Sequence, residues 1–166
     1  MSAPVFRDAE ARDRPAILEI YNHYVLNAAC TFDIEPYTLE RRAPWFDQFS
    51  AQGPHRLLVA EEGGAVLGYA NSMRHRAKAA YDRTVETSIY LHPDWRGRGI
   101  AAPLYGALLE AAAAGGAHLA VAGVSLPNPA SVALHRALGF EEVGTFPEIG
   151  YKFGRYWDTF WMRKLL

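Results

Sequence analysis

Hydrophobic positions near the start of the chain recur at helical spacing. A short strand over residues 5–7 precedes a helix that Asp13 can cap, with Pro15 tolerated in its first turn. The apolar side chains that follow share one helical face: Ile17, Ile20, Tyr21, Tyr24 and Val25. Thr38 can cap a second helix, whose apolar side is predicted to hold Leu39, Trp45, Phe46 and Phe49. The loop between these helices exposes Phe32, either as a core aromatic or as a pocket-lining residue.

After His55 the hydrophobic period changes to two. Residues 57–60 and 66–70 flank Gly63-Gly64, which predicts a β-hairpin. Residues 84–91 alternate as a strand. One face of this strand holds Val85, Thr87, Ile89 and Leu91, and the other holds Glu86, Ser88 and Tyr90.

The second half of the chain predicts helices over 100–114 and 129–138 and strands over 118–124, 142–147 and 157–163. Strand 118–124 is nearly all apolar, as in a parallel pair covered on both faces. We therefore predict a single α/β domain over residues 1–166, with a mixed, mostly antiparallel sheet, helices on both faces and one parallel βαβ junction.

Composition narrows the class of partner. The chain has 17 basic and 18 acidic residues and a formal net charge of −1, which gives no electrostatic case for nucleic acid or an anionic membrane. Cys30 is the single cysteine, so neither an intrachain disulfide nor a cysteine-based metal cluster can form, and no metal is expected. The first residues lack a signal-peptide pattern, so we expect a cytoplasmic protein.

The turn between strand 84–91 and helix 100–114 is suited to bind a phosphate or pyrophosphate. Gly97 and Gly99 permit close backbone approach, the helix start offers unpaired amides, and Arg96 and Arg98 add positive charge. A dinucleotide fingerprint fits poorly, because the next strand has no acidic residue, and a P-loop would need Gly-Lys-Ser/Thr. An ordinary basic surface turn is the remaining alternative.

Two motifs in order resemble the GNAT superfamily of N-acetyltransferases. The first is Arg96-x-x-Gly99-x-Ala101, and the second runs from Asn128 through Ser131 and His135 to Gly139-Phe140. The resemblance implies the GNAT acyltransferase fold and acetyl-CoA as co-substrate. The cofactor-binding residues it implies are Ile89, Tyr90, Leu91, Arg96, Gly97, Arg98, Gly99, Ile100, Ala101, Ala102, Asn128 and Ser131. Ser131 can alternatively be a helix cap.

Three further patterns are similar to the phosphinothricin and methionine sulfoximine N-acetyltransferases. They are Tyr81-x-x-Thr-x-Glu86-x-Ser-Ile-Tyr90, the histidine segment 134–140, and Gly150-x-Lys152-x-Gly154 continuing to Trp157-Asp158. This resemblance implies Glu86 as general base. His135 stands where many superfamily members place a tyrosine that protonates the CoA thiolate. The alternatives are a Glu86 carboxylate paired with Arg83 or another cation, and a histidine that is merely packed in the fold.

The same resemblance places Arg76, Lys78 and Tyr81 against the amino-acid substrate, unless they form a solvated basic loop. Lys78 stands where a second arginine is common and cannot make the same bidentate contact. The predicted function is direct acetyl transfer to the α-amine of a small amino acid or analogue in a ternary complex. The alternatives are acetylation of protein N-termini or polyamines, and a non-catalytic acyl-CoA-binding module. The aromatic segment 151–161 and the resemblance together predict a homodimer.

Overall fold

The computed structural model describes residues 3–166, which form one seven-stranded sheet in the order β1-β2-β3-β4-β5-β7-β6. The strands are β1 Val5–Asp8, β2 Leu57–Glu62, β3 Ala65–Arg74, β4 Thr84–Leu91, β5 Leu119–Ser125, β6 Glu141–Lys152 and β7 Arg155–Leu165. Every neighbouring pair is antiparallel except β4 and β5, which are parallel. The predicted mixed sheet with one parallel junction is confirmed.

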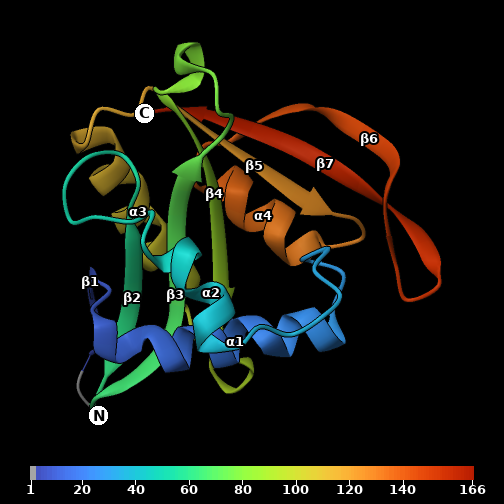
Figure 1. Ribbon diagram of the computed structural model, residues 1–166. Coiled ribbons are helices and arrows are strands. Elements are labelled where there is room, and N and C mark those ends of the chain that lie inside the picture. The colour runs from blue at the N-terminus through green and yellow to red at the C-terminus, as the bar shows by residue number, and fades with distance from the viewer. Residues whose placement is uncertain (1–2) are drawn as a thin grey trace.

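Helices cover both faces of this sheet (Figure 1). They are α1 Arg14–Asn27, α2 Leu39–Phe46, α3 Ala101–Ala114 and α4 Pro129–Ala137, with single 3-10 turns at Ala11–Asp13, Ala79–Tyr81 and Pro93–Trp95. α3 and α4 pack on one face over a core that includes Leu104, Leu108 and Phe160. α1 and α2 pack on the other face over a core rich in tyrosine. Two apolar clusters therefore lie on opposite sides of β3 and β4.

The start of α1 differs from the prediction. Asp13 makes no side-chain cap. Its carboxylate instead accepts hydrogen bonds from the Arg7 guanidinium at 2.7 and 2.9 Å and from the Glu10 amide at 2.7 Å. A carboxylate that is only 4% exposed gains more from a guanidinium than from a single helix amide, so Asp13 ties β1 to the helix start.

The second helix is capped as predicted, because the Thr38 hydroxyl accepts from the Arg41 amide at 3.2 Å. Phe46 is buried, and Trp45 and Phe49 pack against the α1 core, although Phe49 lies beyond the helix end. The prediction for Leu39 was wrong: it is the first residue of α2, where the buried residues are Arg42 and Phe46, and its own side chain is 45% exposed.

The β2–β3 hairpin agrees with the prediction, whereas β6 and β7 differ from it in length. Gly63 and Gly64 have φ of +59° and +86°, the left-handed backbone that a tight hairpin turn between β2 and β3 requires, so this prediction is confirmed. The last two strands are longer than predicted. Register shifts in β6 after Glu142 and after Phe146 absorb the irregular segment around Pro147, and the strand continues to Lys152. The resulting β6–β7 hairpin projects beyond the sheet (Figure 1).

The parallel strands β4 and β5 pair over only three residues and then separate. The paired positions are Thr84 with Leu119, Val85 with Ala120, and Glu86 with Val121. Beyond Glu86, β4 has no strand neighbour on that side within the described residues, so its backbone borders an opening between the two strands.

None of the helices within residues 3–166 is both long enough and apolar enough to cross a membrane.

Candidate active site

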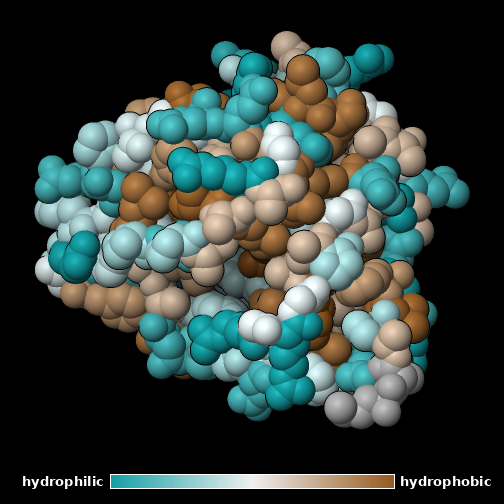
Figure 2. Space-filling model, turned by 180° about the vertical axis from the view of Figure 1, so that it is seen from behind, coloured by the Kyte–Doolittle hydropathy of each residue, from teal (hydrophilic) through white to brown (hydrophobic). Residues whose placement is uncertain are grey.

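The opening between β4 and β5 forms a cleft of about 550 Å³. One wall is β4 from Glu86 to Leu91, the opposite wall is Gly123 to Ser125 of β5, and the ends are closed by the turn before α3 and the start of α4. The face of the molecule seen from behind Figure 1 carries intermixed hydrophilic and hydrophobic side chains, with a hollow near its middle (Figure 2). A cleft with a long strand edge on one side suits an extended ligand that hydrogen-bonds to main-chain groups.

The turn before α3 has the backbone of an anion-binding loop. Gly97 and Gly99 have φ of +74° and +76°. The N-cap residue of α3 is Ile100, and no side chain caps this helix. The first amides of α3 are therefore available to a ligand at the positive end of the helix dipole.

Some of the residues predicted to bind the cofactor in this turn line the cleft, and others have side chains that pack elsewhere. Arg96, Gly97 and Ala101 line the cleft. The guanidinium of Arg98 stacks on the Trp95 ring at 4.5 Å, and Ile100 is 5% exposed and packs in the core. Only the main chain of Ile100 can therefore face a ligand.

The residues predicted to offer main-chain donors lie at the outer end of β4. Ile89, Tyr90 and Leu91 all line the cleft. The Tyr24 hydroxyl of α1 donates to the Leu91 carbonyl at 2.5 Å and fixes the strand end. The sequence-based prediction did not include Tyr24, although it also lines the cleft.

Asn128 and Ser131 lie at the cleft end of α4. The Asn128 side-chain oxygen accepts from the Ser131 amide at 3.1 Å, so Asn128, and not Ser131, is the helix cap. The Ser131 hydroxyl lies 3.4 Å from His135 Nδ1. Both residues line the cleft.

His135 is 4% exposed, and both of its ring nitrogens are hydrogen-bonded. Nδ1 lies 2.7 Å from the Ser131 carbonyl, which can only accept, so we assign the ring proton to Nδ1. Nε2 then accepts from the Tyr105 hydroxyl at 3.0 Å, and Tyr105 contacts the Thr87 hydroxyl at 2.7 Å. Burial lowers the pKa of His135 below its ordinary 6.5, so the ring is neutral at pH 7. Nothing in the sequence singles out Tyr105, because it occupies one of several apolar positions of α3.

Glu86 lies on the α1 face of β4, at the border of the cleft. Its side chain is 41% exposed, and its Oε2 lies 3.2 Å from His75 Nδ1. The alternative interpretation pairs Glu86 with Arg83 or another cation, and the side chain in contact is that of His75, which follows β3. His75 was missed because it lies in a basic segment without periodicity. A carboxylate open to the cleft and held by an imidazole can accept a proton.

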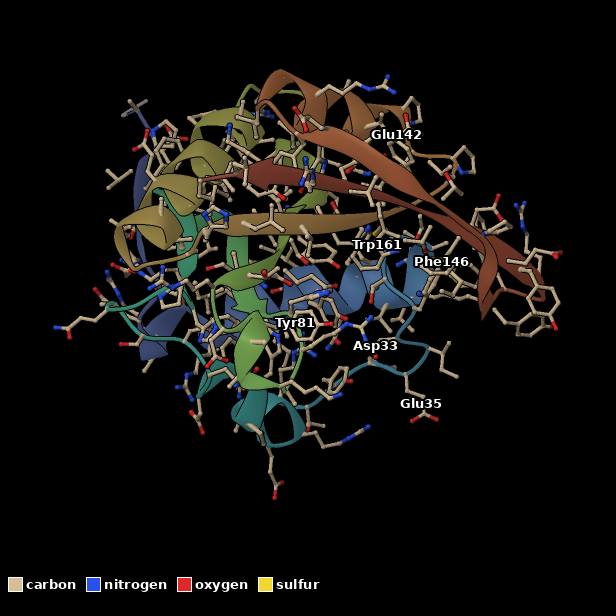
Figure 3. The ribbon with its side chains drawn as sticks, turned by 90° about the horizontal axis from the view of Figure 1, so that it is seen from above. Asp33, Glu35, Tyr81, Glu142, Phe146 and Trp161 are labelled. Atoms are coloured by element: carbon tan, nitrogen blue, oxygen red, sulfur yellow. The ribbon has the colours of Figure 1, made fainter. Side chains whose placement is uncertain are left out.

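Of the predicted substrate residues, Phe32 shares a cavity with Glu86, and Tyr81 contacts its partner His75. Phe32 is 36% exposed and lines a second cavity of about 240 Å³ that also includes Glu86. Tyr81 and Trp161, labelled in Figure 3, both lie against the His75 ring, with centroid distances of 5.8 and 6.5 Å. Arg76 lies 5.9 Å over the Tyr81 ring. Arg76, Lys78 and Tyr81 are exposed and line none of the cavities described here.

Lys152 is a further residue whose position the sequence did not reveal. It is 3% exposed, and its ammonium donates to the carbonyls of Ala28 and Thr31 at 2.7 and 2.8 Å. Burial lowers the pKa of Lys152. Because Cys30 and Thr31 line the cleft, Lys152 fixes one part of its wall from β6.

The described residues contain no group of three or more His, Cys, Asp or Glu side chains suited to a metal ion.

Known proteins resemble this chain along nearly its whole length. A phosphinothricin N-acetyltransferase of Streptomyces coelicolor is 47% identical, with 95% of this chain and 98% of that protein covered. An L-methionine sulfoximine/L-methionine sulfone acetyltransferase of Pseudomonas aeruginosa is 42% identical, with 98% and 94% covered.

Solved structures agree. A GNAT superfamily phosphinothricin acetyltransferase of Sinorhizobium meliloti, solved in complex with acetyl-CoA, superposes with a TM-score of 0.93 at 38% identity, covering 99% of this chain and 89% of that one. The acetyltransferase (GNAT) family matches residues 17–140, which include both walls of the cleft, Glu86 and His135. The predicted resemblance is confirmed, and the chain belongs to the acetyltransferase (GNAT) family.

Proposed function

We propose that the protein transfers the acetyl group of acetyl-CoA to the α-amine of a small amino acid or analogue, of the phosphinothricin, methionine sulfoximine or methionine sulfone type. The observation that supports this most directly is the position of Glu86, at the border between the β4–β5 cleft and the cavities beside α1. A carboxylate there faces both a thioester in the cleft and an amine outside it. The names of the relatives support the same class of acceptor.

We propose that the turn before α3 binds the pyrophosphate of acetyl-CoA. The residues for this contact are Arg96, Gly97, Arg98, Gly99, Ile100, Ala101 and Ala102, mainly through main-chain amides. Asn128 and Ser131 would bind the pantetheine arm from α4, and the amides of Ile89, Tyr90 and Leu91 would hold the thioester carbonyl where its oxyanion develops.

Glu86 is the proposed general base. The amine loses a proton to the Glu86 carboxylate, directly or through water, and its nitrogen attacks the thioester carbon. The new C–N bond forms, the C–S bond breaks, and the departing thiolate takes a proton from water. Cys30 is not proposed as an acyl carrier, because burial raises the pKa of its thiol.

His135 borders the position of the departing thiolate, and two roles are open to it. As general acid it would need the imidazolium form, which burial disfavours. We therefore propose that His135 mainly holds the last turn of α4 against Tyr105 of α3, and that water protonates the thiolate. A His135→Asn variant tests this: near-normal kcat is expected, and loss of the basic limb of the kcat profile would instead establish the acid role.

For the acceptor, we propose that Phe32 and Tyr81 line its path and that Arg76 and Lys78 attract its carboxylate. Lysine offers a point charge without the guanidinium fork, so these contacts would be less directional than a pair of arginines.

We also propose a cytoplasmic homodimer. The projecting β6–β7 hairpin exposes large apolar side chains, among them Phe146 at 58% and Tyr156 at 59%, which a second copy of the chain would cover (Figure 3). Light scattering at micromolar concentration should give twice the mass of the chain, and a monomeric mass would contradict the dimer.

The test of the function is thiol release from acetyl-CoA with a panel of acceptors: L-amino acids, phosphinothricin, methionine sulfoximine, methionine sulfone, polyamines and peptides. The expected result is the highest kcat/KM with the amino acids and analogues. Preference for polyamines or peptides would favour the alternative enzymes, and no thiol release with any amine would favour a non-catalytic acyl-CoA-binding module.

A further inference from the structure

The backbone of Glu86 is fixed by both neighbouring strands. Glu86 is the last residue of β4 that pairs with β5, where its partner is Val121, and it lies opposite Met73 of β3. Neither side chain offers the carboxylate a donor, because valine is apolar and the Met73 thioether itself accepts from Trp45 Nε1 at 3.3 Å. The orientation of the carboxylate therefore depends on a residue outside these strands.

His75 is the residue that holds this carboxylate. Glu86 Oε2 lies 3.2 Å from His75 Nδ1, and within residues 3–166 neither carboxylate oxygen has another hydrogen-bond partner. The Glu86 side chain is 41% exposed, so without this contact it would be free to exchange between rotamers. The single contact with His75 therefore sets the orientation of the carboxylate.

The hydrogen bond occupies one oxygen of the carboxylate. A carboxylate can only accept, so we assign a proton to His75 Nδ1, which donates to Glu86 Oε2. Oε1 has no partner in the described part of the chain and can take a proton from an amine. A group that held both oxygens would leave the carboxylate less able to do so.

The arginines on either side of His75 in the sequence have other partners. Arg74 Nη2 lies 2.5 Å from Asp82 Oδ1, and the Arg76 guanidinium lies 5.9 Å over the Tyr81 ring. A guanidinium beside a carboxylate can bind both of its oxygens in a fork, which an imidazole N–H cannot do. The partner of the Glu86 carboxylate is thus the one side chain of this segment that leaves the second oxygen available.

Two aromatic rings fix the imidazole itself. Tyr81, in the turn before β4, and Trp161 of β7 meet the His75 ring edge-on, with interplanar angles of 72° and 74° (Figure 3). Edge-to-face contacts of this kind are favourable for aromatic pairs and restrict the orientation of each ring. The His75 side chain is 19% exposed, so packing sets its orientation before a ligand binds.

We propose that His75 is a positioning residue for acetyl transfer, which holds the Glu86 carboxylate so that Oε1 is ready to receive the proton of the acceptor amine. Orienting a base in advance speeds the chemical step and adds nothing to the binding of either substrate. His75 itself takes no part in bond making, and it does not line the β4–β5 cleft. This inference rests on the proposed function, with Glu86 as general base, and adds the group that orients the base.

Two substitutions separate the donor from the ring. His75→Phe keeps an aromatic ring beside Tyr81 and Trp161 and removes the donor, whereas His75→Asn keeps an N–H near the position of Nδ1 and removes the ring. We expect kcat to fall by about tenfold in His75→Phe, as for one lost hydrogen bond to a charged group, and to stay within about threefold of wild type in His75→Asn. The KM for acetyl-CoA should not change in either variant. Wild-type kcat in His75→Phe, or an equally slow His75→Asn, would overturn the proposal.

A double-mutant cycle with Glu86 tests whether His75 acts through the carboxylate. In the Glu86→Gln background there is no base to orient, so adding His75→Phe should cause no further loss of kcat. Thiol release from acetyl-CoA, measured with the same acceptor throughout, gives all four rates. An equal loss in both backgrounds would show that His75 acts on the fold or on the acceptor independently of Glu86, and would overturn the proposal.

His118→Phe is the matched control, because His118 is exposed just before β5 and lines neither cavity that includes Glu86. It should change neither kcat nor the KM for acetyl-CoA. If the wild-type protein releases no thiol with any amine, the proposed function is wrong. If Glu86→Gln keeps full turnover, the base assignment is wrong, and the role of His75 with it. If Glu86→Gln is slow and His75→Phe is not, only the role of His75 is wrong.

Discussion

The two sides of the site around Glu86 differ in the groups that they offer to a ligand. On the α3 side, the β4–β5 cleft offers strand backbone, helix amides and glycines with positive φ. On the α1 side, a cavity of about 220 Å³ between α1, α2, β3 and β4 is lined by side chains from five separate segments, among them Tyr21, Arg42 and Trp45. The first side can bind a ligand shared by many enzymes, because main-chain groups do not depend on residue identity. The second side can vary with the acceptor, because each of its contacts belongs to one side chain.

Because Glu86 lies at the border between the two sides, we expect its loss to slow the reaction without weakening the binding of acetyl-CoA on the α3 side. Glu86→Gln should lower kcat by about 10²–10⁴-fold, because the amide cannot take the proton of the amine, with little change in the KM for acetyl-CoA. Steady-state kinetics by thiol release measures both. Glu142→Gln, on the exposed hairpin, is the control and should behave as wild type. Unchanged turnover in Glu86→Gln would refute the base assignment.

The next largest effect is expected on stability, at the 28–31 loop, which Lys152 holds in place. Lys152→Met should reduce the free energy of unfolding by about 2 kcal/mol, since the carbonyls of Ala28 and Thr31 lose a charged donor, partly offset by no longer burying an ammonium. Urea unfolding measures this, with Lys164→Met as the control. A stability equal to that of the control would show that the two hydrogen bonds contribute nothing net.

A substitution that strains the backbone of the turn before α3 tests whether this turn binds acetyl-CoA. Gly99 has φ of +76°, and an added Cβ would meet no atom within 4 Å, so Gly99→Ala strains the turn without a clash. Such strain is worth about 1–2 kcal/mol, which should raise the KM for acetyl-CoA about tenfold while kcat and the relative kcat/KM values of different acceptors stay the same. Gly64→Ala imposes the same kind of strain in the β2–β3 turn, with φ of +86°, and should not change this KM. An equal rise in both variants would argue against a ligand at Gly99.

The smallest expected effect is on the pH dependence of stability. The pKa of His135 is lowered in the fold by burial, so its contribution is fully present above the unfolded value of about 6.5 and is lost as the pH falls below it. Between pH 7 and pH 5, the wild-type protein should lose stability more steeply than His135→Gln, as followed by denaturant unfolding. Parallel curves would show that the ring is not neutralised by the fold.

The sequence was informative where a function depends on local backbone. Gly97, Gly99 and the helix after them are contiguous, so their spacing alone predicted the turn and the start of α3. The alternation in residues 84–91 likewise placed Glu86 opposite the apolar face of β4, and the structure agrees. The errors arose where one side chain has competing partners. Asp13 bonds to Arg7 instead of capping α1, and Leu39 sits in an apolar pattern yet is exposed.

By itself, the sequence determined the order of the elements, the single parallel junction and the family, because each depends on short-range periodicity or on motifs within about a dozen residues. Only the tertiary structure decided which side chains meet: His75 contacts Glu86, Tyr105 contacts His135, Lys152 binds carbonyls of the 28–31 loop, and Arg42 and Asn71 line one cavity. These contacts join segments up to 124 positions apart. Their formation depends on strand register and helix packing, which no local pattern of hydrophobic and polar residues encodes.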